Sequence, residues 1–210
     1  AVLAQAIVAR TSFLTRDRVW TVAMASLAAC ECALSAVFFD FDSTLSVPQP
    51  IARADDFAVA DRVELCMSLS VDEIFQNFGG ADRVLQLRTL LEEMCARRIQ
   101  LFIISLGFTE VIRHHLHTVG LGEYFPPDRI YGQDSRELRQ VGHQKARLIQ
   151  QLLFDNALSA SGALFVDDSA SHITLCRKME VCDCFQVMGN GLSTEEIQSL
   201  KDRLVGATEN

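Results

Sequence analysis

The stretch Ala36-Val37-Phe38-Phe39-Asp40-Phe41-Asp42-Ser43-Thr44 decides the fold of this chain. Its first four residues are apolar and too few for a helix, a pattern that predicts a buried strand. Two aspartates, Asp40 and Asp42, follow the strand one residue apart. A carboxylate pair at the end of a buried strand costs free energy unless a cation or a reaction uses it. The stretch therefore points to phosphoryl chemistry.

The composition is that of an ordinary soluble globular protein. The 210 residues suffice for one sizeable domain with a small appendage; 49% of them are hydrophobic and 22% are charged. The formal net charge of −8 and the pI of about 5.1 argue against nucleic acid or a membrane as the main partner. Part of this acidity fits a site for a divalent cation.

Residues 1–33 are interpreted as an N-terminal extension that is helical or partly disordered. Its first residues contain arginine but no acid, which faintly resembles a transit peptide and leaves organellar targeting open. The apolar stretch from Val19 to Phe39 is too short to cross a bilayer once the first strand is subtracted. We therefore expect no transmembrane helix and a cytoplasmic location.

The seven cysteines are odd in number and scattered along the chain. With no secretory signal peptide evident, this usage predicts reduced thiols in a cytosolic or organellar compartment. The pairs Cys30/Cys32 and Cys182/Cys184 do not have the spacing of a zinc knuckle, so we interpret them as buried structural cysteines.

Predicted strands and helices alternate from the first strand onward. Ser70-Val71-Asp72-Glu73 has the capping-box pattern and starts a short helix that ends at Gly79-Gly80. The alternation predicts an α/β fold, a Rossmann-like three-layer sandwich with a mostly parallel central sheet. We place this domain at residues 34–205, with a small cap or flap insert at 46–80. The other predicted strands are 101–104, 129–131, 163–166 and 184–188, and the other predicted helices are 81–98, 107–119, 145–154, 173–178 and one from 193.

Each candidate chemical group follows a predicted strand or opens a helix. The aspartate pair follows the first strand, Ser105 follows the second, and Asp167-Asp168 follow a later one. Lys145, one of three lysines beside sixteen arginines, opens the helix before that later strand. Ligands bind at the carboxyl edge of parallel sheets, so we expect these groups to lie together.

The order of these groups resembles the haloacid dehalogenase-like (HAD-like) hydrolase superfamily. Its four motifs correspond here to Asp40 to Thr44, Ser105, Lys145 and Asp167-Asp168. Each motif alone is weak, but all four stand in the family's order and strand context across residues 34–205.

The resemblance implies a Mg²⁺-dependent phosphoric monoester hydrolase. Asp40 would attack phosphorus to form an aspartyl-phosphate, and Asp42 would act as general acid and then as general base. The metal would be held by Asp40, by the backbone carbonyl of Asp42 and by Asp168, with Asp167 orienting Lys145 or a metal-bound water. Compensating charge is also a physical requirement, because an anionic carboxylate otherwise repels an anionic phosphate ester.

The resemblance also implies which residues would bind the phosphate group of the substrate. Ser105 and Lys145 would hold the phosphoryl oxygens together with the adjoining Leu106 and Gly107, and Thr44 would help to orient the first motif.

The length of the insert bears on the substrate. Residues 46–80 are too few for a full helical cap, so we expect a site that is open or covered by a flap and one short helix. An open site suits a phosphoprotein, and a short lid suits a small phosphorylated molecule. The sequence leaves both substrates open, and it does not predict the oligomeric state.

Each candidate also has a purely structural interpretation. The aspartate pair could cap a turn, and Ser105 or Asp167-Asp168 could cap helices. Lys145 could be solvated, in which case Arg139 or Arg147 would supply the charge.

The histidines receive simpler interpretations. His114 and His117 share a helical face, but no nearby acid or cysteine completes a metal site, so a polar helix surface is favoured. His143 could touch substrate, although a loop histidine without a role is the simpler interpretation. His172 stands where relatives usually have a small or amide residue and could alter the pocket wall.

Three other functions use the same residues. A phosphomutase shares the nucleophile, although its distinguishing residues lie in a cap that is reduced here. A phospho-accepting domain similar to response-regulator receivers also groups acids and lysine at strand ends, but its lysine comes last, whereas Lys145 precedes Asp167. A non-catalytic phospho-binding module is the third of these functions.

Overall fold

The computed structural model describes residues 34–47 and 59–206 of the chain. The predicted extension at 1–33 and the part of the predicted insert at 48–58 lie outside the described residues. The strands are β1 (Ala36–Phe39), β2 (Gln100–Ile104), β3 (Ile130–Tyr131), β4 (Ala163–Asp167) and β5 (Asp183–Gln186). The α-helices are α2 (Val59–Met67), α3 (Val71–Asn77), α4 (Ala81–Ala96), α5 (Thr109–Thr118), α6 (Arg136–Gln140), α7 (Lys145–Asp155), α8 (Ala170–Lys178) and α9 (Thr194–Gly206). Short turns of other helix types are η1 (Phe41–Leu45), η3 (Gly122–Tyr124), η4 (Pro127–Arg129) and η5 (Ala160–Gly162).

The five strands form one parallel sheet in the order β3-β2-β1-β4-β5. Strand β1 is central: Ala36 is in register with Gln100 of β2 on one side and with Ala163 of β4 on the other. The predicted α/β fold is confirmed, and every strand pair among the described residues is parallel. Because the strands share one direction, the residues that follow β1, β2 and β4 lie at the same edge of the sheet.

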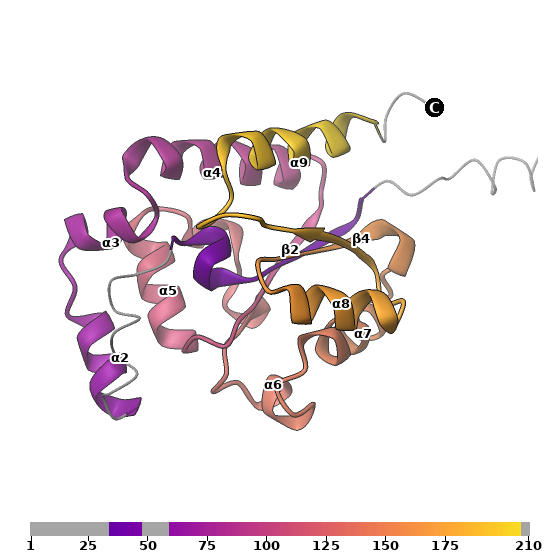
Figure 1. The fold of residues 1–210 in the computed structure, drawn as a ribbon, viewed down its shortest axis with the longest axis horizontal. Helices are drawn as coiled ribbons and strands as arrows, with labels where there is room; N and C mark the ends of the chain where they lie inside the picture. The colour runs from indigo at the N-terminus through magenta and orange to yellow at the C-terminus, as the bar shows by residue number, and fades with distance from the viewer. Residues whose placement is uncertain (1–33, 48–58, 207–210) are drawn as a thin grey trace, which may run out of the picture. The chain divides into compact units, whose positions relative to one another are not determined.

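Alternate residues of β1 face two separate hydrophobic cores, which makes the domain three-layered. Val37 and Phe39 pack with buried side chains of α3, α4, α5 and α9. Ala36 and Phe38 pack with α6, α7 and α8, and the Phe38 ring stacks on that of Phe102 at 4.8 Å between centroids. Figure 1 shows α4 and α9 on one side of the sheet and α6, α7 and α8 on the other. The continuous apolar run at 36–39 is therefore buried on both faces, as parallel strands are.

The ends of several helices differ from their predicted positions for local reasons. Helix α4 stops at Ala96 rather than at residue 98, because Arg98 has a φ of 61°, a left-handed value that no helix continues. Helix α5 begins at Thr109, two residues later than predicted, and α8 begins at Ala170, three residues earlier. The predicted capping box of α3 is present: the Ser70 hydroxyl accepts from the Glu73 amide, and the Glu73 carboxylate accepts from the Ser70 amide.

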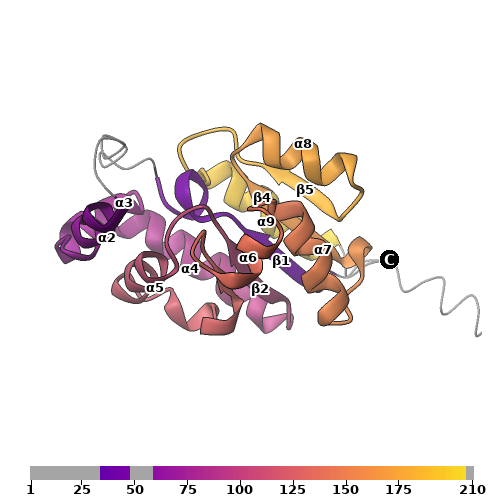
Figure 2. The same ribbon diagram turned by 90° about the horizontal axis from the view of Figure 1, so that it is seen from below.

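Two helices were not predicted, and one of them belongs to the insert. Helix α6 is a single turn between β3 and α7. Helix α2 lies beside α5, where the ring nitrogen Nε2 of His115 is 3.1 Å from the carbonyl oxygen of Cys66. Figure 2 shows α2, α3 and α5 together at one end of the domain. No helix in the described part of the chain has the length and apolar character needed to cross a membrane.

Candidate active site

Asp40 is fixed at the carboxyl end of β1 by both its backbone and its side chain. Its amide donates to the Val166 carbonyl of β4 at 2.8 Å. Its Oδ1 accepts from the Phe41 amide at 2.7 Å and lies 2.8 Å from Nζ of Lys145. The other oxygen, Oδ2, has no hydrogen bond from any described residue, so one face of a buried carboxylate is left for a ligand.

The turn η1 carries the chain out of the sheet and places the second aspartate at the mouth of the site. Asp42 has extended backbone angles, and Ser43 has a φ of 58°, in the left-handed region that non-glycine residues rarely occupy. Asp42 Oδ2 accepts a hydrogen bond of 3.3 Å from the Ser105 hydroxyl. Such backbone angles cluster at functional sites, where the surrounding structure holds them.

Gly107 closes the approach to Asp42 from the end of β2. Its amide donates to Oγ of Ser105 at 3.0 Å. A Cβ atom added to Gly107 would lie 2.9 Å from Oδ2 of Asp42, so a larger residue would crowd the carboxylate. Leu106, which lies between Ser105 and Gly107 in the sequence, is 44% exposed.

Lys145 lies between two buried carboxylates. Its Nζ is 2.8 Å from Asp40 Oδ1 and 2.7 Å from Asp167 Oδ2, and all three residues are nearly inaccessible to solvent. Burial alone would lower the pKa of Lys145, but the charges of Asp40 and Asp167 outweigh it and raise that pKa. The lysine is therefore a buried ammonium ion rather than a solvated helix residue, and Arg139 and Arg147 are exposed.

The two aspartates after β4 differ in how many partners they have. Asp167 Oδ1 accepts from the Ser169 amide at 2.7 Å, and Nδ1 of His172 lies 3.2 Å from Asp167 Oδ2. Asp168 is half-buried, and none of the described residues forms a hydrogen bond with its carboxylate. Burial would raise the pKa of Asp167, but His172 and Lys145 hold it below its ordinary value.

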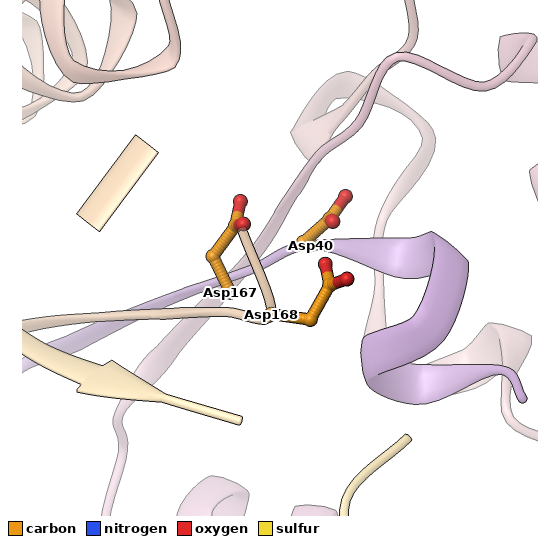
Figure 3. Close-up of side chains that lie close together, drawn as sticks. All are labelled: Asp40, Asp167 and Asp168. Carbon is orange, nitrogen blue, oxygen red and sulfur yellow. The ribbon is translucent and has the colours of Figure 1, made fainter. Parts of the chain in front are cut away.

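Asp40, Asp167 and Asp168 form a cluster of oxygen donors. One carboxylate oxygen from each lies within 4.8 Å of the others. Figure 3 shows the three carboxylates directed into the same space at the ends of β1 and β4. Oxygen-only donors of this kind suit a hard divalent cation such as Mg²⁺, so the residues fit the predicted metal.

The pKa values of the two catalytic candidates are both raised. Burial raises the pKa of Asp40 to about 7, although Lys145 opposes this shift. Asp42 is exposed at the mouth of the site, yet the protein around it partly displaces water and raises its pKa as well, against the hydrogen bond from Ser105. Asp42 is thus suited to carry a proton at a higher pH than an ordinary aspartate.

Thr44 does not join the other predicted residues through its side chain. Its hydroxyl is buried and has no hydrogen-bond partner among the described residues. Its carbonyl accepts from the Leu192 amide at 2.9 Å and from the guanidinium of Arg83 at 3.1 Å. The contacts of Thr44 are therefore made by its backbone.

Arg83 is a residue of the site that no sequence pattern had singled out. Its half-buried guanidinium donates to four carbonyl oxygens, of Thr44, Leu45, Phe78 and Leu192, at 2.8–3.1 Å. These bonds join η1, the end of the insert and the loop after β5. In the sequence Arg83 is one more polar residue on a helix, because its partners are backbone atoms and leave no pattern.

Helix α2 of the insert places an unpredicted cysteine, Cys66, near Asp42. Burial raises the pKa of the Cys66 thiol, and the nearby Asp42 carboxylate adds to this shift. Arg62 lies one turn before Cys66 on α2, and its Nε is buried without a hydrogen-bond partner in the described part of the chain. Arg62 and Cys66 are four residues apart, a spacing that places two side chains on one face of a helix, but no helix was predicted there.

The comparisons agree with the resemblance at the level of the fold. No protein-family model and no curated protein matches the chain. Among solved structures, the HAD domain of effector protein Lem4 from Legionella pneumophila is 11% identical over 85% of this chain and 97% of that domain, with a TM-score of 0.53. The chain has the HAD-like fold.

Two further structures are similar to the chain. DsGPDH of Dunaliella salina is 15% identical over 80% of this chain, with a TM-score of 0.52, and the match spans 26% of that longer protein. A haloacid dehalogenase-like hydrolase from Streptococcus pneumoniae is 21% identical over 80% of this chain and 91% of its own, with a TM-score of 0.46. In this HAD-like fold Asp40, Ser105 and Asp167 lie at the ends of strands, and Lys145 begins a helix. The fold brings all four to one edge of the sheet.

Proposed function

We propose that the chain is a Mg²⁺-dependent phosphoric monoester hydrolase that acts through an aspartyl-phosphate on Asp40. One observation carries the proposal: a buried ammonium group, Lys145, lies within 2.8 Å of both Asp40 and Asp167 where a third carboxylate converges. This arrangement joins a nucleophile, a cation and a set of metal ligands in one place. A phosphate ester needs all three, since positioning and charge stabilisation account for most catalysis of phosphoryl transfer.

The two aspartates would divide the chemistry. Asp40 Oδ2, which has no protein partner among the described residues, would attack phosphorus, and the bond from phosphorus to the leaving oxygen would break. Asp42, whose pKa is raised, would give its proton to that oxygen. Asp42 would then take a proton from the water that hydrolyses the aspartyl-phosphate and so return to its starting state.

The remaining residues would hold the metal and the phosphoryl group. Asp40, Asp168 and the backbone carbonyl of Asp42 are the groups that would hold Mg²⁺, which when bound supplies positive charge beside the phosphoryl oxygens. Asp167 is already engaged by Lys145 and Ser169, which suits it to orient the lysine.

The phosphoryl oxygens would be held by Lys145, by the Ser105 hydroxyl and by the backbone amides of Leu106 and Gly107. In the structure the Ser105 hydroxyl already bonds to Asp42, so the serine is well placed to orient both the acid and the substrate.

A colorimetric assay with para-nitrophenyl phosphate tests this proposal. We expect Mg²⁺-dependent release of phosphate that is lost, by at least about a thousandfold, in Asp40→Asn. Asp42→Asn should retain phosphorylation by a substrate with a good leaving group but slow the hydrolysis of the intermediate. No turnover above the Asp40→Asn background across a broad panel of phosphoesters and phosphopeptides would refute a hydrolase and favour a phospho-binding module.

Two outcomes of the same assay would favour a different reaction. Slow hydrolysis with a stable phosphoprotein would favour a phospho-accepting domain. Transfer of phosphate to a second position of a sugar phosphate, rather than to water, would favour a phosphomutase. Mass spectrometry of the intact chain after brief exposure to substrate detects phosphate that stays on Asp40, and analysis of the sugar-phosphate product detects transfer to a second position.

A further inference from the structure

Three cysteines lie together where α8 meets β5, in the core on the α6–α8 side of the sheet. Cys176 is in α8, Cys182 is in the turn that follows, and Cys184 is in β5. The sulfur atoms of Cys176 and Cys182 are 3.8 Å apart, and Cys184 Sγ is 3.6 Å from the Cys182 carbonyl oxygen. Of Cys182 and Cys184, which the sequence predicts to be buried, Cys184 is buried and Cys182 is only partly so, and the Cys182 sulfur contacts that of Cys176.

The backbone brings these two sulfur atoms together. Helix α8 ends in a turn in which the Val181 amide donates to the Cys176 carbonyl at 3.2 Å, and Glu180 has a left-handed φ of 52°. This turn reverses the chain within six residues and folds Cys182 back over the last turn of the helix. Hydrogen bonds of the main chain therefore place the two cysteine residues close together.

We propose that Cys176 and Cys182 form a thiol-oxidation site that a peroxide, or a low-molecular-weight disulfide, converts into an intramolecular disulfide. A disulfide has sulfur atoms about 2.05 Å apart, so sulfur atoms already in contact need only a small movement. The proposal concerns this bond alone and is independent of the proposed phosphatase activity.

Exposure decides which sulfur reacts first. Cys176 is fully buried and Cys184 nearly so, whereas Cys182 is half-buried and is the member of the cluster that an oxidant in solvent can reach. The Cys184 thiol donates its own proton to the Cys182 carbonyl at 3.6 Å, so the proton that Cys182 loses as it attacks passes to solvent.

The reaction with a peroxide balances in two steps. The Cys182 sulfur attacks one peroxide oxygen, the oxygen–oxygen bond breaks, and a sulfenic acid and water (or an alcohol, from an organic peroxide) are formed. The Cys176 sulfur then attacks the sulfenic sulfur, the sulfur–oxygen bond breaks, and a second water leaves. Two thiols are oxidised to one disulfide, and the peroxide is reduced. A low-molecular-weight disulfide follows the same route through a mixed disulfide and releases two thiols.

The oxidation site is on the same helix as a contact of the candidate active site. His172 lies one turn before Cys176 in α8 and contacts Asp167. The disulfide would tie the last turn of α8 to the chain that enters β5. It would therefore restrain the end of a helix whose beginning holds the Asp167 carboxylate.

Tryptic mapping of the full chain tests the proposal directly. Trypsin cuts after Arg177 and Lys178, between the two cysteines, so a Cys176–Cys182 disulfide joins peptides 148–177 and 179–201, whereas a Cys182–Cys184 disulfide stays within one peptide. We expect treatment with hydrogen peroxide or glutathione disulfide, followed by blocking of free thiols, to give the joined pair, and dithiothreitol to release it.

Serine variants identify the sulfur atoms. The joined peptides should be absent from Cys176→Ser and Cys182→Ser and present in Cys184→Ser. A disulfide within peptide 179–201, a link to Cys66 or Cys95, or oxidation of Cys182 to sulfinic acid without a cross-link would overturn the proposal. The wild-type map decides the question even if a variant fails to fold, and because no activity is measured, its failure is distinct from failure of the phosphatase proposal.

Discussion

The floor of the candidate site and the insert beside it are built in opposite ways. On the floor, Asp40, Lys145 and Asp167 are buried at the ends of central strands and fixed by contacts of 2.7–2.8 Å. In the insert, α2 lies against α5, its Leu65 and Met67 side chains are more than one third exposed, and Arg62 is half-buried. Under the proposed function the floor would carry the reaction and the insert would face the part of the substrate that varies, so the two can be altered separately.

The largest effect is expected on the floor, from Lys145→Met. Removing the ammonium group leaves two buried carboxylates without a counter-charge, which should cost about 3–5 kcal/mol in the free energy of unfolding. Urea denaturation at pH 8 measures this loss. Lys178→Met, at an exposed lysine of α8, is the matched control and should change stability by less than about 0.5 kcal/mol. Equal effects of the two substitutions would contradict the assignment of Lys145 to a buried charge cluster.

The next effect is a dependence of cation binding on pH. The pKa of Asp40 is raised to about 7, so the metal-free folded protein gains stability from the proton on Asp40 at low pH and loses it as the pH rises through 7. Mg²⁺ competes with that proton. Its affinity should therefore fall by about tenfold for each pH unit below 7 and level off above it.

Titration calorimetry at pH 6 and pH 8 measures this affinity. Asp40→Asn should bind Mg²⁺ more weakly and with a much smaller dependence on pH. An affinity of the wild-type protein that is the same at both values would mean that the proton on Asp40 does not compete with the metal.

A smaller effect is expected in the insert, from Arg62→Ala. The Arg62 Nε is buried without a hydrogen-bond partner among the described residues, which leaves it available to an anionic group of the substrate. Loss of the guanidinium should raise KM by about tenfold for substrates that carry a second anionic group, the size expected for one hydrogen bond to a charged group. The kcat for para-nitrophenyl phosphate should stay the same, because the floor is untouched. Arg97→Ala, at the opposite edge of the sheet, is the control. A fall in kcat for all substrates would contradict the prediction that the insert affects substrate binding and the floor affects the reaction.

The smallest effect is expected at the turn that joins the two regions. Ser43 has a left-handed φ of 58°, which costs a β-branched residue more than it costs serine. Ser43→Val should destabilise the protein by about 1–2 kcal/mol, while Ser43→Gly should stay within about 1 kcal/mol of the wild type. Thermal unfolding of the two variants compares them, and an equal loss in both would show that the hydroxyl, rather than the backbone angle, is what matters.

The floor was largely predictable from the sequence, and the insert was not. The apolar run before Asp40 predicts a buried strand, and the alternation of elements brings Ser105, Lys145 and Asp167 to one edge whatever the details of packing. These are consequences of strand direction, which periodicity reveals. The family resemblance added the roles of the residues but no contact.

The parts that escaped prediction depend on contacts between distant segments. Arg83 binds four backbone carbonyls, and no residue type marks a carbonyl in a sequence. Helix α6 has five residues and buries only Leu138, too short a segment for periodicity to show. The direction of the Thr44 hydroxyl, which is buried, is set by the backbone path of η1 and could not be predicted from the residues of the motif.

The central place of β1 has a consequence for how the protein is made. Both neighbours of this strand come later in the chain, and the Ser35 hydroxyl bonds to the Gly162 carbonyl, 127 residues away. At the usual pace of translation, β1 waits roughly 6–25 s on the ribosome before β4 has been synthesised. Throughout that interval at least one edge of this strand of four apolar residues is unpaired. The segment that ends in the proposed nucleophile therefore needs protection from aggregation during synthesis.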